Sequence, residues 1–358
     1  MSSEHKALFL TALHTPLSSG TRPTPTPTQN EVLVRVLAAG LNPHDSLGKE
    51  TGLFTKSFLP RAILATDVVG RVTALGPGVT KYREGDVVMT QSKLVPEDTL
   101  PDTAGLQEFA IVDVRHSCKV PKGVGVDEAG TVSGNPIAAY IALFHPEQLG
   151  FTPPLPGKPK AEYENDALLV VGGGSQTGRF GIQFAKLAGV GKIIVVAGKK
   201  GEAELRKLGA THVVDRHGSD DDIEKEVRAI VGDELVYAYD TIGAGADDAP
   251  EAPVATLALK CLSKSKFGKL STLLPGGDDV EAAKMKKGGY QKKYASGATF
   301  EHPDLMLPYW DALPTWLGNG DIVPGAYEVV EGLNPEKVNA CLDAYRDGKN
   351  QIKPSVHP

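Results

Sequence analysis

Cysteine is scarce in this chain of 358 residues. Three are present, Cys118, Cys261 and Cys341, and they lie far apart without any Cys-x-x-Cys spacing. That count excludes both a disulfide framework and a four-cysteine zinc site. Since nothing in the flanking sequence indicates a lowered thiol pKa, we expect each cysteine to be a small buried apolar residue rather than a nucleophile.

Long apolar runs and a basic surplus are also missing. The run at 7–13 is too short to cross a membrane and follows no basic start, and no later stretch approaches about 18 uncharged apolar residues. The net charge is −6, from 38 basic and 44 acidic residues, whereas nucleic-acid-binding proteins normally carry a basic surplus. These absences predict a soluble, cytoplasmic protein that binds neither a membrane nor a nucleic acid.

The length predicts two domains, and the first is rich in predicted strands. Within 31–38, Val32, Val34 and Val36 share one face of a strand, as period-2 alternation requires. Further strands are predicted within 65–75 and 82–89, separated by Gly/Pro turns, which is typical of a small barrel or sandwich. The proline-rich segment 21–28 must be extended, either as a connector between strands or as a polyproline II ligand motif.

After about residue 125, strand-like and helix-like runs alternate. A helix is expected within 127–144, with Pro136 near a helix start. The alternation predicts a parallel sheet covered on both faces. The polar segment 278–297 is predicted as a loop or weak helix, and 335–346 as a helix. The predicted domains are 1–125, 126–275, and a part at 276–358 that completes the sheet and returns to the first domain. The predicted strands lie at 167–171, 192–197, 212–215, 235–240 and 269–274, and the helices between them at 178–188, 202–208 and 221–231.

Over residues 168–189, an apolar strand ends in a glycine-rich turn that leads directly into an amphipathic helix. Small residues let a backbone approach a pyrophosphate, and the helix N-terminus offers free N–H groups and partial positive charge. The spacing departs from Gly-x-Gly-x-x-Gly, because Ser175 replaces the second glycine. The strand–turn–helix context favours a dinucleotide site over a flexible loop of an unrelated α/β fold. The predicted contacts are Gly173, Gly174, Ser175, Gln176, Thr177 and Gly178.

The end of the second strand of this region carries no acidic residue. An NAD-specific site usually places Asp or Glu there to hold the ribose 2′-hydroxyl, whereas this chain has Gly198, Lys199 and Lys200. A lysine can neutralise a 2′-phosphate, so the sequence predicts NADPH rather than NADH as the cofactor. The alternative, that the lysines are solvated surface charges, still applies to one of them.

Further motifs follow in a fixed order along nearly the whole chain. They are Gly-Leu-Asn-Pro-His-Asp at 40–45, Asp-Val-Val-Gly at 67–70 with Gly-Asp at 85–86, Val-Ser-Gly-Asn-Pro-Ile-Ala-Ala-Tyr at 132–140, Leu-Gly-Ala-Thr-His-Val-Val-Asp at 208–215 and Tyr-Asp-Thr-Ile-Gly at 239–243. Together with the turn, they resemble the medium-chain dehydrogenase/reductase superfamily, specifically its zinc-independent quinone oxidoreductases and enoyl reductases. Within that branch, the chain is similar to fungal trans-enoyl reductases that work beside polyketide synthases. The resemblance implies an α/β fold with a GroES-like, partly open β-barrel domain and a Rossmann doubly wound parallel sheet.

The resemblance also implies roles for particular residues. The turn at Ser175, Gln176 and Thr177 would contact phosphates, and Gly198 and Lys199 would contact the adenosine 2′-phosphate. Arg216 stands where many relatives have a tyrosine, and an arginine can pair with phosphate or stack on adenine. The residues that would flank the nicotinamide are Thr241, Ile242, Leu274 and Pro275.

Zinc ligands are missing at the family's positions. In zinc members the first ligand falls near Asn42 and a His-Glu pair falls on Thr66-Asp67, and none of these positions keeps its ligand. The four-cysteine structural lobe is missing as well, so we expect no metal site. Without a Lewis acid, polarising a plain carbonyl is harder, whereas an already activated C=C needs less help.

The sequence assigns no catalytic acid, because 52–55 lacks the tyrosine that mitochondrial-type enoyl reductases use there. Asn42 and Asn135 are the polar residues expected nearest the nicotinamide, although either could be structural, since Asn before Pro often fixes a turn. Asp45 and Lys49 are candidates for the pocket or for solvated surface positions. The pocket itself is expected to depend on irregular segments at 47–60, 144–164 and 306–316.

These observations predict an NADPH-dependent oxidoreductase that transfers hydride to an activated C=C of an enone, enoyl thioester or quinone without zinc. Two alternatives stay open: a zinc-free carbonyl or alcohol dehydrogenase of the same fold, and a non-catalytic NADPH-binding protein. The expected substrate is a small molecule or an acyl-carrier-bound compound, and the expected state is a monomer or homodimer.

Overall fold

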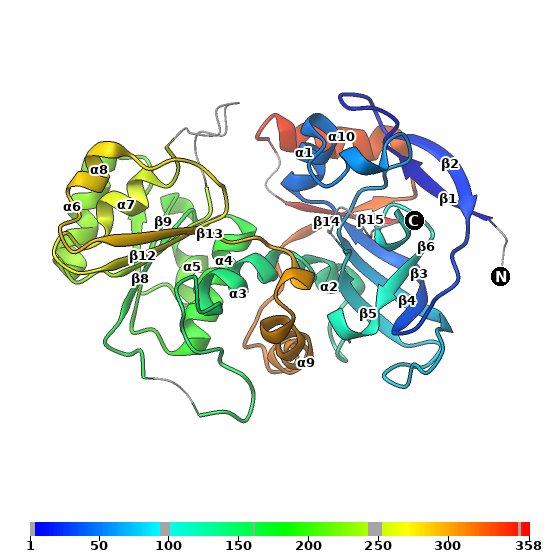
Figure 1. Cartoon of the computed structure of the whole chain (residues 1–358), viewed down its shortest axis with the longest axis horizontal. Helices are drawn as coiled ribbons and strands as arrows, with labels where there is room; N and C mark the ends of the chain where they lie inside the picture. The colour runs from blue at the N-terminus through cyan, green and yellow to red at the C-terminus, as the bar shows by residue number, and fades with distance from the viewer. Residues whose placement is uncertain (1–3, 94–100, 160–161, 243–252, 350–351) are drawn as a thin grey trace. The chain divides into compact units, whose positions relative to one another are not determined.

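The computed structural model of the chain describes residues 4–93, 101–159, 162–242, 253–349 and 352–358. It divides into two compact units (Figure 1). The first unit comprises Met1–Gly134, Ala298–Gly320 and Pro324–Pro358, and the second comprises Asn135–Gly297 and Asp321–Val323. Within the described ranges, no helix combines the length and the apolar character that a membrane crossing requires. Gly243, which ends the motif at 239–243, lies outside the described residues.

The first unit is built on a mostly antiparallel sheet that curves around its core. Strand β3 pairs with β4 on one side, and on its other side with β6 and, at its end, β15. The strands of this sheet follow the order β14-β15-β3-β4-β5-β7, and its two end strands do not pair with each other. The pairing of β3 with β4 shifts register at two places, and such bulges bend a strand. A separate hairpin joins β1 (Glu4–Phe9) and β2 (Ser18–Pro23). The sheet strands are β3 (Glu31–Gly40), β4 (Asp67–Leu75), β5 (Val87–Gln91), β6 (Phe109–Asp113), β7 (Ser117–Lys119), β14 (Tyr327–Glu331) and β15 (Lys353–His357).

The core of this unit begins with the predicted apolar face of β3. Val32, Val34 and Val36 are all buried in one hydrophobic cluster, which confirms their shared face. Helix α2 (Val126–Val132) packs against β3 and β4, so it lies in the first unit, and the units divide after Gly134 rather than at 125/126. Gly134 is required at that junction, because a Cβ there would lie 2.0 Å from Asp67 Oδ1.

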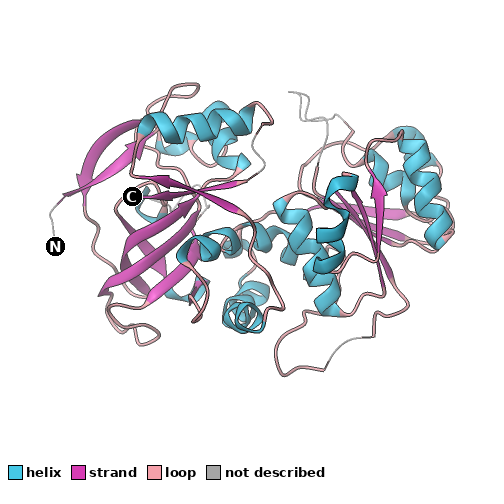
Figure 2. Ribbon diagram, turned by 180° about the vertical axis from the view of Figure 1, so that it is seen from behind, coloured by secondary structure: helices cyan, strands magenta, loops and turns pink. Residues whose placement is uncertain are grey.

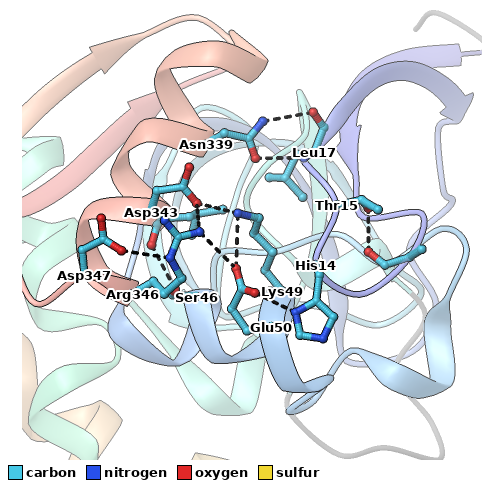
Figure 3. A network of polar contacts seen from close by, with 12 residues as sticks. His14, Thr15, Leu17, Ser46, Lys49, Glu50, Asn339, Asp343, Arg346 and Asp347 are labelled. Atoms are coloured by element: carbon cyan, nitrogen blue, oxygen red, sulfur yellow. Dashed lines mark hydrogen bonds and ion pairs between the residues drawn. The ribbon is translucent and has the colours of Figure 1, made fainter.

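Helix α1 (Pro43–Thr51) packs against α10 (Pro335–Arg346), as Figure 3 shows. Lys49 Nζ donates to Asp343 Oδ1 at 2.6 Å, and Ser46 Oγ donates to the Leu342 carbonyl oxygen at 2.9 Å. The expectation that 47–60 is irregular is therefore wrong at its start. Lys49 is buried, so it is not a solvated surface charge, and its ion pair with Asp343 holds α1 in place.

The second unit is a six-stranded, entirely parallel sheet in the order β10-β9-β8-β11-β12-β13. Helices cover both faces of this sheet (Figures 1 and 2). The chain runs outward from β8 through β9 to β10, then returns to β11 on the other side of β8, which makes β8/β11 the topological switch point where ligands bind in such sheets. The strands are β8 (Ala167–Val171), β9 (Lys192–Ala197), β10 (His212–Asp215), β11 (Tyr237–Asp240), β12 (Gly268–Thr272) and β13 (Tyr290–Tyr294), and the helices are α3 (Asn135–Phe144), α4 (Gln176–Ala188), α5 (Glu202–Leu208), α6 (Asp220–Val231), α7 (Thr256–Cys261) and α8 (Val280–Lys284).

Two segments are more regular than predicted. The segment 278–297, predicted as a loop or weak helix, holds the short helix α8, which agrees with the second alternative, and the strand β13, which was not predicted. Because β13 is an edge strand with only partly buried or exposed residues, its sequence Tyr-Gln-Lys-Lys-Tyr has no apolar pattern to reveal it. The segment 306–316 lies in α9 (Pro303–Asn319), a helix of the first unit that contains Pro308 and Pro314. Its buried Met306, Tyr309, Trp310 and Leu313 follow helical spacing and outweigh the prolines.

Candidate functional site

The glycine-rich turn joins β8 to α4 with very little space. Ser175 is the N-cap of α4, and its Oγ accepts a hydrogen bond from the Gly178 N–H at 3.0 Å. A Cβ at Gly178 would lie 2.4 Å from the Gly172 carbonyl oxygen, and a Cβ at Gly173 would lie 2.1 Å from Val195 Cγ1. The serine that breaks the glycine pattern therefore caps the helix, while the glycines let the strand and helix approach each other.

The structure brings this turn together with the end of β11. Ser175 Oγ and Thr241 Oγ1 lie 2.9 Å apart, and Thr241 Oγ1 donates to the Val171 carbonyl oxygen at 3.0 Å. Ile242 follows with an exposed side chain. Leu274 and Pro275 come shortly after β12, the neighbour of β11, so both pairs of predicted nicotinamide-flanking residues leave the same carboxyl edge of the sheet.

A cavity of about 350 Å³ opens along this edge, lined from the ends of β8, β9 and β11. Arg216, directly after β10, lines it, and Gly198 lies beside Arg216, since a Cβ on Gly198 would be 3.7 Å from Arg216 Nε. Ala255 also lines it with φ of 59°, a backbone conformation that is strained for alanine. Of the remaining predicted contacts, Gly174 belongs to the turn, and Gln176 and Thr177 are the first two residues of α4.

The positively charged side chains near this cavity differ in whether they already have an ion-pair partner. Lys199 Nζ pairs with Glu202 at 3.0 Å and its side chain is 61% exposed, and Lys200 is exposed next to it. Within the described parts of the chain, the Arg216 guanidinium has no hydrogen bond or ion pair. His217, which the sequence analysis did not single out, lies close to Gly198 as well. The tight glycine turn and the Arg216 guanidinium at the cavity, which has no ion-pair partner in the described chain, would fit a dinucleotide that carries an extra phosphate.

In the first unit, the positions of the family's zinc ligands contain an ion pair. Lys353 Nζ donates to Asn42 Oδ1 at 2.5 Å and to Asp67 Oδ2, and Asn42 Nδ2 donates to the same Asp67 oxygen at 2.8 Å. All three residues are at most 2% exposed. An ammonium group between an amide and a carboxylate does not fit a zinc ion, and no group of three or more potential metal ligands occurs in the described ranges. Sequence reasoning missed Lys353, because it lies 286 residues from Asp67.

A hollow in the same unit lies next to this ion pair. Thr66, the residue before Asp67, lines it together with His44 of α1, and His44 Nε2 lies 2.9 Å from Thr66 Oγ1. Asp45 also lines the hollow, although burial raises its pKa and both of its oxygens accept backbone N–H groups, from Asn42 at 2.7 Å and Ala65 at 2.8 Å. Asn135, the other asparagine predicted near the nicotinamide, is the first residue of α3 and belongs to the second unit.

The cysteines lie away from both hollows. Cys118 and Cys261 are buried, and Cys341 is partly buried. Burial raises the pKa of all three thiols, for Cys261 to about 12. The prediction that they are inert apolar residues agrees with these surroundings.

Comparison with known proteins supports the family resemblance. The model of the alcohol dehydrogenase GroES-like domain matches residues 28–122, and that of zinc-binding dehydrogenases matches 177–257. The trans-enoyl reductase tazE of Aspergillus terreus is 30% identical over 62% of this chain and 71% of that protein. The chain belongs to the medium-chain dehydrogenase/reductase superfamily. The chloroplast envelope quinone oxidoreductase homolog of Arabidopsis thaliana is 34% identical over 54% of each chain.

Solved structures of this superfamily share the fold. The mycobacterial protein Rv1454c complexed with NADPH superimposes with a TM-score of 0.71 at 20% identity, covering 99% of this chain and 100% of that one. The predicted fold class, a GroES-like domain with a Rossmann domain, is thereby confirmed. The chain is an oxidoreductase of this superfamily with quinone oxidoreductases and enoyl reductases among its relatives.

Proposed function

We propose that the protein is an NADPH-dependent reductase that transfers hydride to an activated C=C bond of an enone, enoyl thioester or quinone without zinc. The observation that carries this proposal is the Lys353 ammonium fixed between Asn42 and Asp67. Because this ion pair takes the place of metal ligands, a carbonyl here must be polarised by hydrogen bonds alone. A conjugated double bond demands less polarisation than a simple aldehyde or ketone.

The second unit would hold the cofactor. The α4 N-terminus and the turn Gly173–Gly178 would bind the pyrophosphate, and Arg216 with one lysine would bind the 2′-phosphate. Thr241, Ile242, Leu274 and Pro275 would flank the nicotinamide. Bound NADPH supplies the hydride. We further propose a cytoplasmic monomer or homodimer that acts on a small-molecule or carrier-bound substrate.

A substrate panel tests the function. NADPH oxidation is followed with an aliphatic enone, an enoyl thioester, a quinone and a simple aldehyde, and the same panel is repeated with NADH. We expect turnover of at least one conjugated substrate to exceed turnover of the aldehyde, and NADPH to be preferred. Faster aldehyde reduction would select a zinc-free carbonyl reductase instead, and tight NADPH binding without any turnover would select a non-catalytic protein.

Zinc should neither bind stoichiometrically nor stabilise the protein. A ligand that binds only the folded state raises the melting temperature, so the Tm of the purified protein should be the same with zinc and with EDTA. Metal analysis of protein expressed with added zinc is the second measurement. One equivalent of retained zinc together with a raised Tm would contradict the interpretation that the Lys353 ion pair takes the place of zinc ligands.

Arg216 should matter more for NADPH binding than Lys199. A hydrogen bond to a charged group is worth about 1.5–3 kcal/mol, so Arg216→Ala should raise the Kd of NADPH by about tenfold or more and leave the Kd of NADH nearly unchanged. Lys199→Ala should have a smaller effect, because Lys199 already pairs with Glu202. Fluorescence titration measures both constants.

Lys207→Ala, an exposed charge on α5, is the matched control for these variants. If Arg216→Ala weakened NADPH and NADH equally, the guanidinium would stack on adenine rather than bind the 2′-phosphate. If Lys199→Ala left NADPH binding intact, that lysine would be only a surface charge.

A further inference from the structure

The hollow beside the Lys353 ion pair lies wholly in the first unit, and its lining suggests what it binds. Apolar side chains form much of its wall, and its polar groups include the hydrogen-bonded pair of His44 and Thr66 and a second hydroxyl pair, Ser92 and Thr103, 2.9 Å apart, while Asp45, Thr55 and Lys93 also line it. We propose that the Thr66 hydroxyl, positioned by His44, donates the hydrogen bond that receives the carbonyl oxygen of a narrow, linear α,β-unsaturated carbonyl compound. This inference rests on the proposed function and names its substrate class. The apolar walls are Leu53, Phe54, Phe58, Ile63 and Leu64.

The Thr66 hydroxyl has the hydrogen-bonding capacity for this role. A threonine oxygen carries one donor hydrogen and two lone pairs. When the Nε2–H of His44 donates to Thr66 Oγ1 over their 2.9 Å contact, the threonine hydrogen is left for a ligand. By contrast, Asp45 is committed to two backbone N–H groups and Thr55 Oγ1 donates to the Gly48 carbonyl oxygen at 2.7 Å.

Backbone strain is concentrated at the same hollow. Among the described residues, five that are not glycine have positive φ, and two of them, Phe54 at 60° and Ala65 at 71°, line this hollow. Ala65 directly precedes Thr66, and its conformation is held on both sides: its N–H donates to Asp45 Oδ1 and its carbonyl oxygen accepts from the Gly105 N–H at 2.7 Å. Such strain persists where the surroundings fix it, and it clusters at functional sites. Here it fixes the position of Thr66.

The partner of Thr66 is fixed as well. His44 lies in the first turn of α1, which Lys49 and Ser46 attach to α10 (Figure 3). Its ring also makes an edge contact with Phe54, with 6.3 Å between ring centroids. The hydrogen-bond pair is therefore preorganised, which is what a recognition site for one carbonyl oxygen requires.

The size of the hollow selects the shape of the substrate. Its volume is small, about 50 Å³, and the aromatic rings of Phe54 and Phe58 lie among its walls. We expect a narrow, linear C=C–C=O head to enter it more readily than a six-membered quinone ring, so linear substrates should be preferred.

The test compares Thr66→Val with Thr66→Ser, and uses Thr73→Val on β4, whose hydroxyl bonds the Leu33 carbonyl oxygen, as the matched control. Two readouts are taken: kcat and KM for an aliphatic enone and a quinone with NADPH, and calorimetric binding of the unreactive saturated ketone of the same chain length. Thr66→Val should lose about tenfold or more in kcat/KM for the enone and bind the ketone correspondingly more weakly. Thr66→Ser should retain both, and the Kd of NADPH should not change in either variant.

His44→Phe should weaken ketone binding, and His44→Gln should recover part of it, because an amide N–H can still donate to Thr66. The inference is overturned if Thr66→Val behaves like Thr73→Val, or if the wild-type protein prefers the quinone to the enone. Failure of the proposed function gives a different result: the wild-type protein would reduce no conjugated substrate, while the ketone-binding difference between Thr66→Val and Thr66→Ser would persist.

Discussion

Replacing Lys353 with methionine should lower the free energy of unfolding by about 3–5 kcal/mol, which is the usual cost of removing one partner of a buried ion pair. Methionine preserves much of the side-chain length but leaves Asp67 charged, fully buried and without its cation. Asp67 Oδ1 already has no hydrogen-bond partner among the described residues, so the carboxylate has little other support. Urea denaturation measures the change.

The double variant Asp67→Asn with Lys353→Met separates the charge from the packing. It removes both ionic groups, so its unfolding free energy should lie closer to that of the wild type than to that of Lys353→Met alone. Lys293→Met, an exposed lysine on the edge strand β13, should change stability by no more than about 0.5 kcal/mol. Lys353→Met behaving like Lys293→Met would show that the buried ammonium is not an important part of the fold.

The parts of the fold that were predicted correctly depend on contacts between residues close in sequence. The strands at 167–171, 192–197 and 212–215 and the helix at 202–208 agree with β8, β9, β10 and α5 residue for residue. Each is a short run whose apolar period or flanking glycines are visible locally. The segments β13 and α9 were missed because the decisive factor is tertiary. An edge strand needs no apolar face, and the buried aromatic residues of α9 outweigh its two internal prolines.

The candidate site likewise contains some residues that could be predicted from nearby sequence and others that depend on tertiary contacts. Ser175 was predicted from the strand–turn–helix context and Thr241 from the family resemblance, and the structure joins them by a 2.9 Å contact. The sequence around Lys353 does not distinguish it from a lysine on the surface. Its role becomes visible in the structure, where β15 pairs with β3 and Lys353 contacts Asn42 and Asp67. Likewise, the sequence predicts both Lys199 and Arg216 as contacts of a phosphate of the cofactor and does not distinguish between them. The structure shows that Lys199 is already paired with Glu202.

Alanine substitutions at two glycines of the segment 173–178 should have different effects on stability and on NADPH binding, because the surroundings of the two glycines differ. A Cβ on Gly178 would lie 2.4 Å from the Gly172 carbonyl oxygen and 2.8 Å from Gly173 Cα, and neither backbone atom can move without separating α4 from β8. Gly178→Ala should therefore destabilise the fold by about 1–3 kcal/mol and abolish measurable NADPH binding. A Cβ on Gly174 would meet no heavy atom of the described chain within 4 Å.

Gly174→Ala should consequently leave the unfolding free energy within about 0.5 kcal/mol of the wild type while raising the Kd of NADPH at least about tenfold, since the added methyl group would occupy space that the pyrophosphate needs. Gly318→Ala is the control, because a Cβ there is equally uncontacted by described atoms and its place in α9 is outside the turn. Urea denaturation and NADPH titration of the three variants distinguish the roles. Unchanged NADPH affinity in Gly174→Ala would mean that the turn packs a helix on a strand without contacting the cofactor, and the proposed cofactor site would then have to be abandoned.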